Sequence, residues 1–228
     1  MKTAFTSLLL AGAMCAGTML APSQAEATDP PVHIDNVTFY GSGCTGADDT
    51  TLRLLDVSPP DGLADQFIVG FDNYLVFQEP GSSQVDRRKF CNLDVVFHFP
   101  GGLQFSIVDV RYEGFASLPY GVYGTQESTY VFPFFSNSVT LRSTLRGLFE
   151  GNYNIRDTLG LTSLVWSPCG LRAPMRIRTQ IYLSGLRYPP AIMTTDTVDG
   201  RVDQIYHLRW RPCTTRAKAE GARGGGRS

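Results

Sequence analysis

The stretch CNLDVVFHFPGGLQFSI, residues 91–107, decides the fold class of this chain. Asn92, Asp94 and His98 lie between apolar residues in its first half. Successive side chains of a β-strand point to opposite faces, so this alternation predicts a strand with one buried face. The apolar residues that define the buried face are Cys91, Leu93, Val95, Phe97 and Phe99.

The Pro-Gly-Gly sequence at 100–102 supplies a turn, and the apolar alternation resumes at Leu103, Phe105 and Ile107. We therefore expect the segments on either side of this turn to pair as a hairpin. The apolar phase then shifts by one residue. This shift predicts a β-bulge, or a stretch buried on both faces, over Val108, Val110 and Tyr112.

Other segments show the same alternation. Ile177, Thr179, Ile181 and Leu183 predict one more half-buried strand. Asp199-Gly200 is typical of a tight hairpin turn, after which we expect an inward-facing row of aromatic and aliphatic residues. That row is Tyr206, Leu208 and Trp210, and shorter strands are expected at 34–40, 66–70, 74–77 and 129–132.

One segment, 139–150, offers a short helix. Leu141, Leu145 and Leu148 have near-helical spacing, although Gly147 and several β-branched residues weaken the helix. Many short antiparallel strands bury their apolar faces best in two packed sheets. The sequence therefore predicts an all-β protein, an antiparallel β-sandwich or jelly roll, with at most one short helix.

Lys2 and the apolar run at 8–20 are typical of a signal peptide, with cleavage expected after Ala25 or Ala27. The run is shorter than the roughly 20 apolar residues that span a bilayer. We expect a signal peptide at 1–25, a single disulfide-braced domain at 26–213 and a disordered, basic, glycine-rich tail at 214–228. The protein is accordingly predicted to be secreted and extracellular.

Four cysteines follow the predicted signal peptide, and in an exported protein an even number favours structural disulfides. Their wide separation does not fit the close Cys pairs of zinc sites. Four cysteines allow three pairings, and order along the chain favours the first cysteine with the second and the third with the fourth. They are Cys44, Cys91, Cys169 and Cys213.

Five short motifs link the chain to a known family. The sequence resembles secreted fungal and bacterial proteins of the domain-of-unknown-function family 4360, and the resemblance covers nearly the whole mature chain. It implies export, a cysteine framework and a compact domain, and it brings no established reaction or catalytic residue. The motifs are Gly41-Ser42-Gly43-Cys44, Arg88-Lys89-Phe90-Cys91, Gly124-Thr125-Gln126, Trp166-Ser167-Pro168-Cys169-Gly170 and Trp210-Arg211-Pro212-Cys213.

Candidate catalytic groups are few. The sequence has no G-x-S-x-G, H-E-x-x-H, Walker or G-x-G-x-x-G motif. His98 or His207 could join a serine and an aspartate, but each falls on the polar side of a predicted strand. A carboxylate pair could hydrolyse a glycoside. The candidates near the predicted hairpin are Asp94, Asp109 and Glu113, and solvation of an outward strand face explains them equally well.

Candidate binding groups also have plain structural explanations. Three aspartates around Gly200 could bind calcium, although their spacing is not that of an EF-hand and a turn accounts for them. Two groups of basic residues could form a patch for an anionic polymer if their strands are adjacent, while cross-strand pairing with aspartates is the alternative. The aspartates are Asp196, Asp199 and Asp203, and the basic residues are Arg176 and Arg178 with His207, Arg209 and Arg211.

Phe132-Pro133-Phe134-Phe135 is either an exposed aromatic loop or part of the sandwich edge. Asn36-Val37-Thr38 is an N-glycosylation sequon, meaningful in a eukaryotic source, so Asn36 is predicted to lie at the surface of a glycoprotein. The charge of the basic tail leaves the body acidic, which argues against nucleic-acid binding.

These observations favour a non-catalytic extracellular, cell-wall or surface-associated binding or structural protein. Its expected partner is an extracellular polysaccharide or a surface protein, with no cofactor, metal, nucleic acid or membrane span. The alternative is a secreted hydrolase that acts on polysaccharide with a carboxylate pair.

Overall fold

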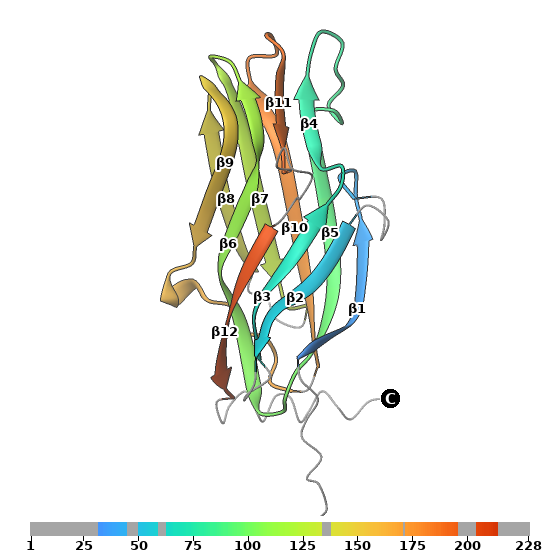
Figure 1. Ribbon diagram of the computed structural model, residues 1–228, viewed down its shortest axis with the longest axis vertical. Coiled ribbons are helices and arrows are strands. Elements are labelled where there is room, and N and C mark those ends of the chain that lie inside the picture. The colour runs from blue at the N-terminus through green and yellow to red at the C-terminus, as the bar shows by residue number, and fades with distance from the viewer. Residues whose placement is uncertain are drawn as a thin grey trace, which may run out of the picture.

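The computed structural model describes residues 32–44, 50–58, 63–133, 138–170, 172–195 and 204–213. They form an antiparallel β-sandwich of twelve strands, and the two sheets pack face to face (Figure 1). This is the predicted fold class. The described residues contain one 3-10 turn, Leu161–Ser163, and no α-helix. None of them forms a helix long and apolar enough to cross a membrane.

The five-stranded sheet has the spatial order β1 (His33–Tyr40), β5 (Arg88–His98), β10 (Arg172–Gly185), β7 (Val122–Val131) and β8 (Ser138–Arg146). The seven-stranded sheet has the order β2 (Thr50–Ser58), β3 (Leu63–Phe71), β12 (Gln204–Pro212), β6 (Leu103–Leu118), β11 (Ala191–Thr194) and β4 (Leu75–Gln78). Strand β9 (Phe149–Thr158) completes the seven-stranded sheet by pairing with β6.

The predicted inner row of residues 91–99 is buried, but the predicted hairpin is wrong. β5 pairs with β1 and β10, whereas β6 pairs with β9, β11 and β12, so the Pro-Gly-Gly turn connects the two sheets. The apolar rows of the two strands face each other across the sandwich. The Phe105 ring lies 5.2 Å from that of Phe97 and 5.5 Å from that of Phe99, centroid to centroid. Burial of both apolar rows against each other explains the arrangement.

The β-bulge predicted from the phase shift in β6 is confirmed. His207 of β12 opposes Asp109 and the next residue, Leu208, opposes Ile107, so Val108 is the extra residue. After the bulge, Val110 and Tyr112 return to the buried face.

The predicted helix at 139–150 is wrong, because these residues belong to β8 and β9. Val139, Leu141 and Leu145 also share one face at the two-residue period of a strand, and β7 offers β8 a complete antiparallel partner. Leu148 lies between the two strands with 82% of its surface exposed. Pairing with β7 thus decides between two patterns that Leu141 and Leu145 fit about equally.

The second predicted hairpin is also wrong. β11 and β12 are both antiparallel to β6 and lie one after the other along it, β11 beside Ala116–Ser117 and β12 beside residues 103–112. They therefore do not pair with each other. Asp199-Gly200 itself lies outside the described residues.

A buried polar layer crosses the otherwise apolar core. Thr179 Oγ1 of the five-stranded sheet accepts hydrogen bonds from Gln126 Nε2 (2.9 Å) and from Gln204 Nε2 of the seven-stranded sheet (3.0 Å). The Tyr206 hydroxyl donates to Gln204 Oε1 at 2.8 Å. Burial raises the pKa of Tyr206 and of nearby Tyr74 well above the ordinary value. The layer joins the two sheets by specific contacts and not by apolar area alone.

Two disulfides, Cys44–Cys91 and Cys169–Cys213, brace the sandwich, and they are the pairs that order along the chain favours. Gly43, next to Cys44, has no room for a side chain, because a Cβ there would overlap the ring of Tyr74. The second bridge joins the loop that carries Ser167 to the end of β12. Phe105 N donates to Ser167 Oγ at 3.0 Å, so this loop is also tied to β6.

Candidate functional site

The outer face of the five-stranded sheet combines aromatic rings with planar polar groups. The strand register sets side chains from β1, β5, β10 and β7 beside one another in rows across the sheet. One row is Tyr40, Asn92, Arg178 and Thr129, the next is Phe90, Gln180 and Glu127, and the third is Arg88, Tyr182 and Thr125. Tyr40 is 48% exposed.

Two arginines in these rows are held by neutral groups. Arg88 lies over the Tyr182 ring, 5.0 Å from its centroid, and donates to Gln180 Oε1 at 2.9 Å. Arg178 lies 5.2 Å from the centroid of the Phe90 ring. A guanidinium held by an amide or a ring keeps its full positive charge for a ligand.

Two other arginines of the same face are neutralised. Arg142 pairs with Glu127, which also accepts from Gln180. Arg176 pairs with Asp94 at 2.6 Å, and hydrogen bonding to that carboxylate raises the pKa of Arg176. The Arg176–Asp94 pair is the cross-strand alternative that the sequence left open.

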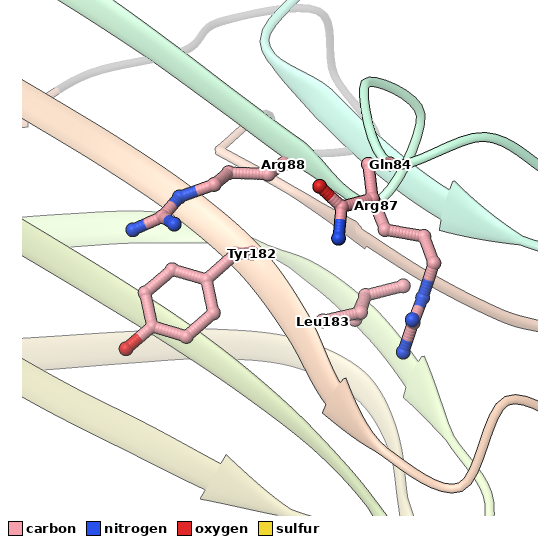
Figure 2. Close-up of a pocket in the computed structure, with 5 residues that line it drawn as sticks. All are labelled: Gln84, Arg87, Arg88, Tyr182 and Leu183. Atoms are coloured by element: carbon pink, nitrogen blue, oxygen red, sulfur yellow. The ribbon is translucent and has the colours of Figure 1, made fainter.

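A pocket of about 150 Å³ opens at one end of this face, lined by Gln84, Arg87, Arg88, Tyr182 and Leu183 (Figure 2). Figure 2 shows the Arg88 guanidinium beside the Tyr182 ring, with Arg87 on the other side of Gln84. Arg87 Nε donates to the amide oxygen of Gln78 at 3.2 Å. The lining therefore supplies two positive charges, and each has a neutral amide partner.

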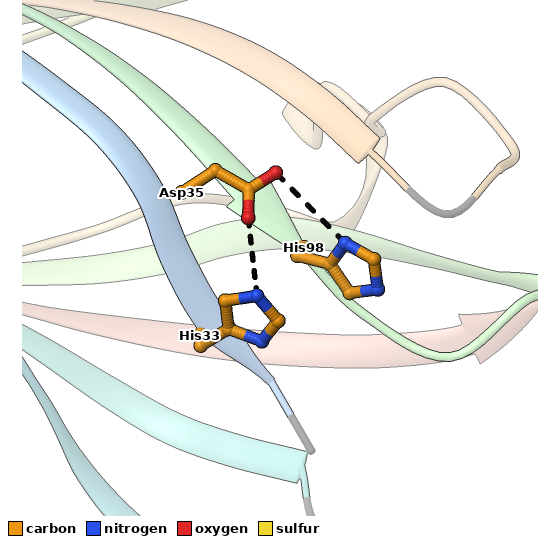
Figure 3. A group of neighbouring side chains, drawn as sticks. All are labelled: His33, Asp35 and His98. Atoms are coloured by element: carbon orange, nitrogen blue, oxygen red, sulfur yellow. Dashed lines mark ion pairs between the residues drawn. The ribbon is translucent and has the colours of Figure 1, made fainter. Parts of the chain in front are cut away.

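At another point of the same sheet, two imidazoles and a carboxylate converge (Figure 3). Asp35 Oδ1 lies 3.0 Å from His33 Nε2, and Asp35 Oδ2 lies 3.8 Å from His98 Nδ1. The two rings are stacked, with centroids 4.5 Å apart. Arg172 Nε approaches Asp35 Oδ2 at 2.6 Å. We call these four residues the Asp35 cluster.

The outer face of the seven-stranded sheet carries the other predicted carboxylates in closed ion pairs. Asp109 accepts two hydrogen bonds from Arg156, at 3.1 and 2.9 Å, and lies 2.6 Å from His207 Nδ1. We call these three residues the Asp109 cluster. Glu113 pairs with Arg111 at 2.9 Å. The predicted carboxylates do not form one group, because Asp94 lies on the other sheet.

The two sheets also separate the other predicted groups. His98 and His207 lie on different sheets. The two basic groups are also separated: the five-stranded sheet carries Arg176 and Arg178, and the seven-stranded sheet carries His207, Arg209 and Arg211. The adjacency required for a basic patch is therefore absent. Arg211 lies over the Trp166 ring at 3.8 Å, where burial lowers its pKa.

The remaining candidates fall partly outside the described residues. Phe132 is buried and contacts Phe105 at 5.5 Å between centroids, whereas Phe134 and Phe135 are not described. Asp196, Asp199 and Asp203 are also not described. Asn36 lies in β1 and is exposed, so its glycosylation stays a prediction.

Sequence reasoning missed His33, Asp35 and Arg172. The His-x-Asp sequence at 33–35 was visible, but the register of β1 on β5 was needed to bring His98 to it. Arg172 joins from β10, more than 70 residues along the chain from His98.

These features define a disulfide-braced β-sandwich protein with two polar outer faces. The sequence profile of the family described as "Domain of unknown function (DUF4360)" matches residues 30–213, and the chain belongs to that family. An "Uncharacterized secreted protein" of Arthroderma benhamiae is 37% identical over 191 residues, which cover 83% of this chain and 75% of that protein. The protein described here is likewise secreted.

Two solved structures show weak likeness. TmCBM61 in complex with β-1,4-galactotriose is 10% identical with a TM-score of 0.25, covering 78% of this chain and 90% of that one. A structure on the promiscuous specificity of carbohydrate-binding modules from the β-sandwich superfamily is 10% identical with a TM-score of 0.26, covering 77% and 56%. Likeness at this level gives no information on the ligand.

Proposed function

We propose that this secreted protein is a non-catalytic binding protein for extracellular polysaccharide, and that the outer face of the five-stranded sheet binds the polymer. The observation that carries the proposal is the presence of two cation–π pairs on this face, Arg88 over Tyr182 and Arg178 over Phe90. Gln180 and Asn92 lie beside them in the strand register.

These groups suit a sugar chain. Guanidinium and amide groups present paired donors and acceptors that can bond to neighbouring hydroxyls, while ring and guanidinium planes contact the apolar faces of the sugars. Strand positions hold such groups more rigidly than loops do. The positive charges of Arg87, Arg88 and Arg178 favour a polymer that carries carboxylates over a neutral one.

The test is binding of the purified, oxidised protein to acidic and neutral wall polysaccharides, with release of reducing sugars measured in parallel. We expect retention on an acidic polymer without products, weakened by added salt. Arg178→Ala and Tyr182→Ala are each expected to raise the dissociation constant about tenfold. The matched control is Arg111→Ala, an arginine on the outer face of the other sheet.

Loss of binding with Arg111→Ala but not with the two face variants would overturn the proposed surface. Binding to none of the polymers would overturn the proposed function. Release of sugars by the wild type would instead favour the hydrolase alternative.

A further inference from the structure

The β1 strand carries a bulge at the Asp35 cluster. Ile34 pairs with Phe97 and Asn36 with Val96, so Asp35 is the extra residue without a partner on β5. A bulge re-aims side chains relative to the regular alternation. Here it brings the Asp35 carboxylate to His33 and His98, which oppose each other in the register.

The separation of the polar atoms suits one metal ion. The potential ligand atoms of His33, Asp35 and His98 all lie within 4.8 Å of one another. Zinc bonds of about 2.0–2.2 Å place the ligands of a tetrahedral ion about 3.3 Å apart. The separation is 3.0 Å from His33 Nε2 to Asp35 Oδ1 and 3.8 Å from His98 Nδ1 to Asp35 Oδ2, on either side of that value. Side-chain rotations would bring one carboxylate oxygen and the two ring nitrogens to the ion.

We propose that His33, Asp35 and His98 form a zinc site at the edge of the five-stranded sheet. Two imidazoles and one carboxylate are ligands that Zn²⁺ accepts, and three protein ligands leave one coordination position open. The ion can enter from solvent, because the His33 side chain is 47% exposed and that of His98 21%. A bound ion would also fasten β1, an edge strand, to β5.

Arg172 limits the affinity of the proposed site for zinc. Its Nε contacts Asp35 Oδ2 and leaves Oδ1 to face His33, so it orients the carboxylate as hydrogen-bonding partners of metal ligands do. Its positive charge opposes the ion. The Arg172 side chain is 64% exposed and can turn toward solvent when the ion binds.

The test is a calorimetric zinc titration, with a competing chelator, of the full mature protein after removal of any affinity tag. We expect one ion per chain for the wild type and weaker binding as the pH falls, because metal competes with protons for imidazole. His33→Gln and His98→Gln are each expected to weaken binding at least about 100-fold. The matched control is His207→Gln in the Asp109 cluster, where binding should be unchanged.

Calcium provides a second control, because it prefers oxygen ligands and should not displace zinc. The proposal is overturned if the wild type binds no zinc, if the two variants bind it as well as the wild type, or if calcium competes equally. Circular dichroism checks that each variant is folded. Should His98→Gln fail to fold, the more exposed His33 variant decides the question.

Discussion

The Asp35 cluster and the Asp109 cluster contain the same three residue types, yet they differ in how the arginine meets the carboxylate. Arg156 binds both oxygens of Asp109, whose side chain is 8% exposed, and one histidine completes the cluster. Arg172 approaches a single oxygen of Asp35, whose side chain is 18% exposed. Two histidines, His33 and His98, lie beside the same carboxylate. The first is a closed ion pair. In the second, an Asp35 oxygen and the two imidazoles are the zinc ligands that we propose.

Some arginines of the two outer faces show the same contrast, although Arg142 and Arg176 on the five-stranded sheet are neutralised and Arg211 on the seven-stranded sheet lies over the Trp166 ring. On the seven-stranded sheet, Asp109 and Glu113 neutralise Arg156 and Arg111. On the five-stranded sheet, Arg88 lies over the Tyr182 ring and donates to the Gln180 amide oxygen, and Arg178 lies over the Phe90 ring. The difference teaches that arginine count alone does not locate a binding surface. What locates it is the chemistry of each arginine's partner, which depends on strand register.

The largest expected effect concerns the two disulfides. They close loops of similar separation, 47 and 44 residues, so removing either by paired Cys→Ala substitution should lower the free energy of unfolding by about 4 kcal/mol. Chemical denaturation measures this. A large inequality between the bridges would show that native packing, and not chain entropy, dominates.

Mild reduction should separate the two bridges. Cys44 and Cys91 are 1% and 0% exposed, whereas Cys169 and Cys213 are only partly buried. We expect reductant to open Cys169–Cys213 first, because thiolate attack requires access to a sulfur. Mass spectrometry of alkylated protein, taken at intervals, measures the order. Simultaneous opening would mean that the whole sandwich unfolds before either bridge reacts.

The next effect concerns the contact that couples the two sheets. Thr179→Val keeps the shape of the side chain but removes the acceptor used by Gln126 and Gln204, both of them 0% exposed. Buried donors without partners should cost about 2–3 kcal/mol. Thr179→Ser keeps the acceptor and is the control. Equal losses for both variants would show that the methyl group matters and the polar layer does not.

Sequence alone predicted the fold class, the buried rows, the bulge in β6 and the disulfide pairs. These depend on local alternation and on order along the chain. It failed where the choice of partner strand decides the structure: β5 and β6 lie in different sheets, and pairing with the preceding strand β7 makes 139–146 part of a strand. The quoted motifs serve the framework, since Cys44, Cys91, Gln126 and Ser167 are all buried. The Arg88-Lys89-Phe90-Cys91 motif also supplies Arg88 and Phe90 to the proposed binding face, whereas the Asp35 cluster lies outside all five motifs.

The smallest effect tests the comparison between the two clusters directly. Asp109→Asn removes the charge from a nearly buried carboxylate that holds both Arg156 and His207, and should lower stability by about 1–2 kcal/mol. Asp35→Asn should lower it by less than about 0.5 kcal/mol in the absence of metal, because its cluster is more open to solvent.

The response to zinc should also distinguish the two variants. Zinc should stabilise the wild type and Asp109→Asn but not Asp35→Asn, because a ligand stabilises only the folded form that binds it. Thermal unfolding of the three proteins with and without zinc measures both effects, and equal responses to zinc would contradict the distinction between an open and a closed cluster.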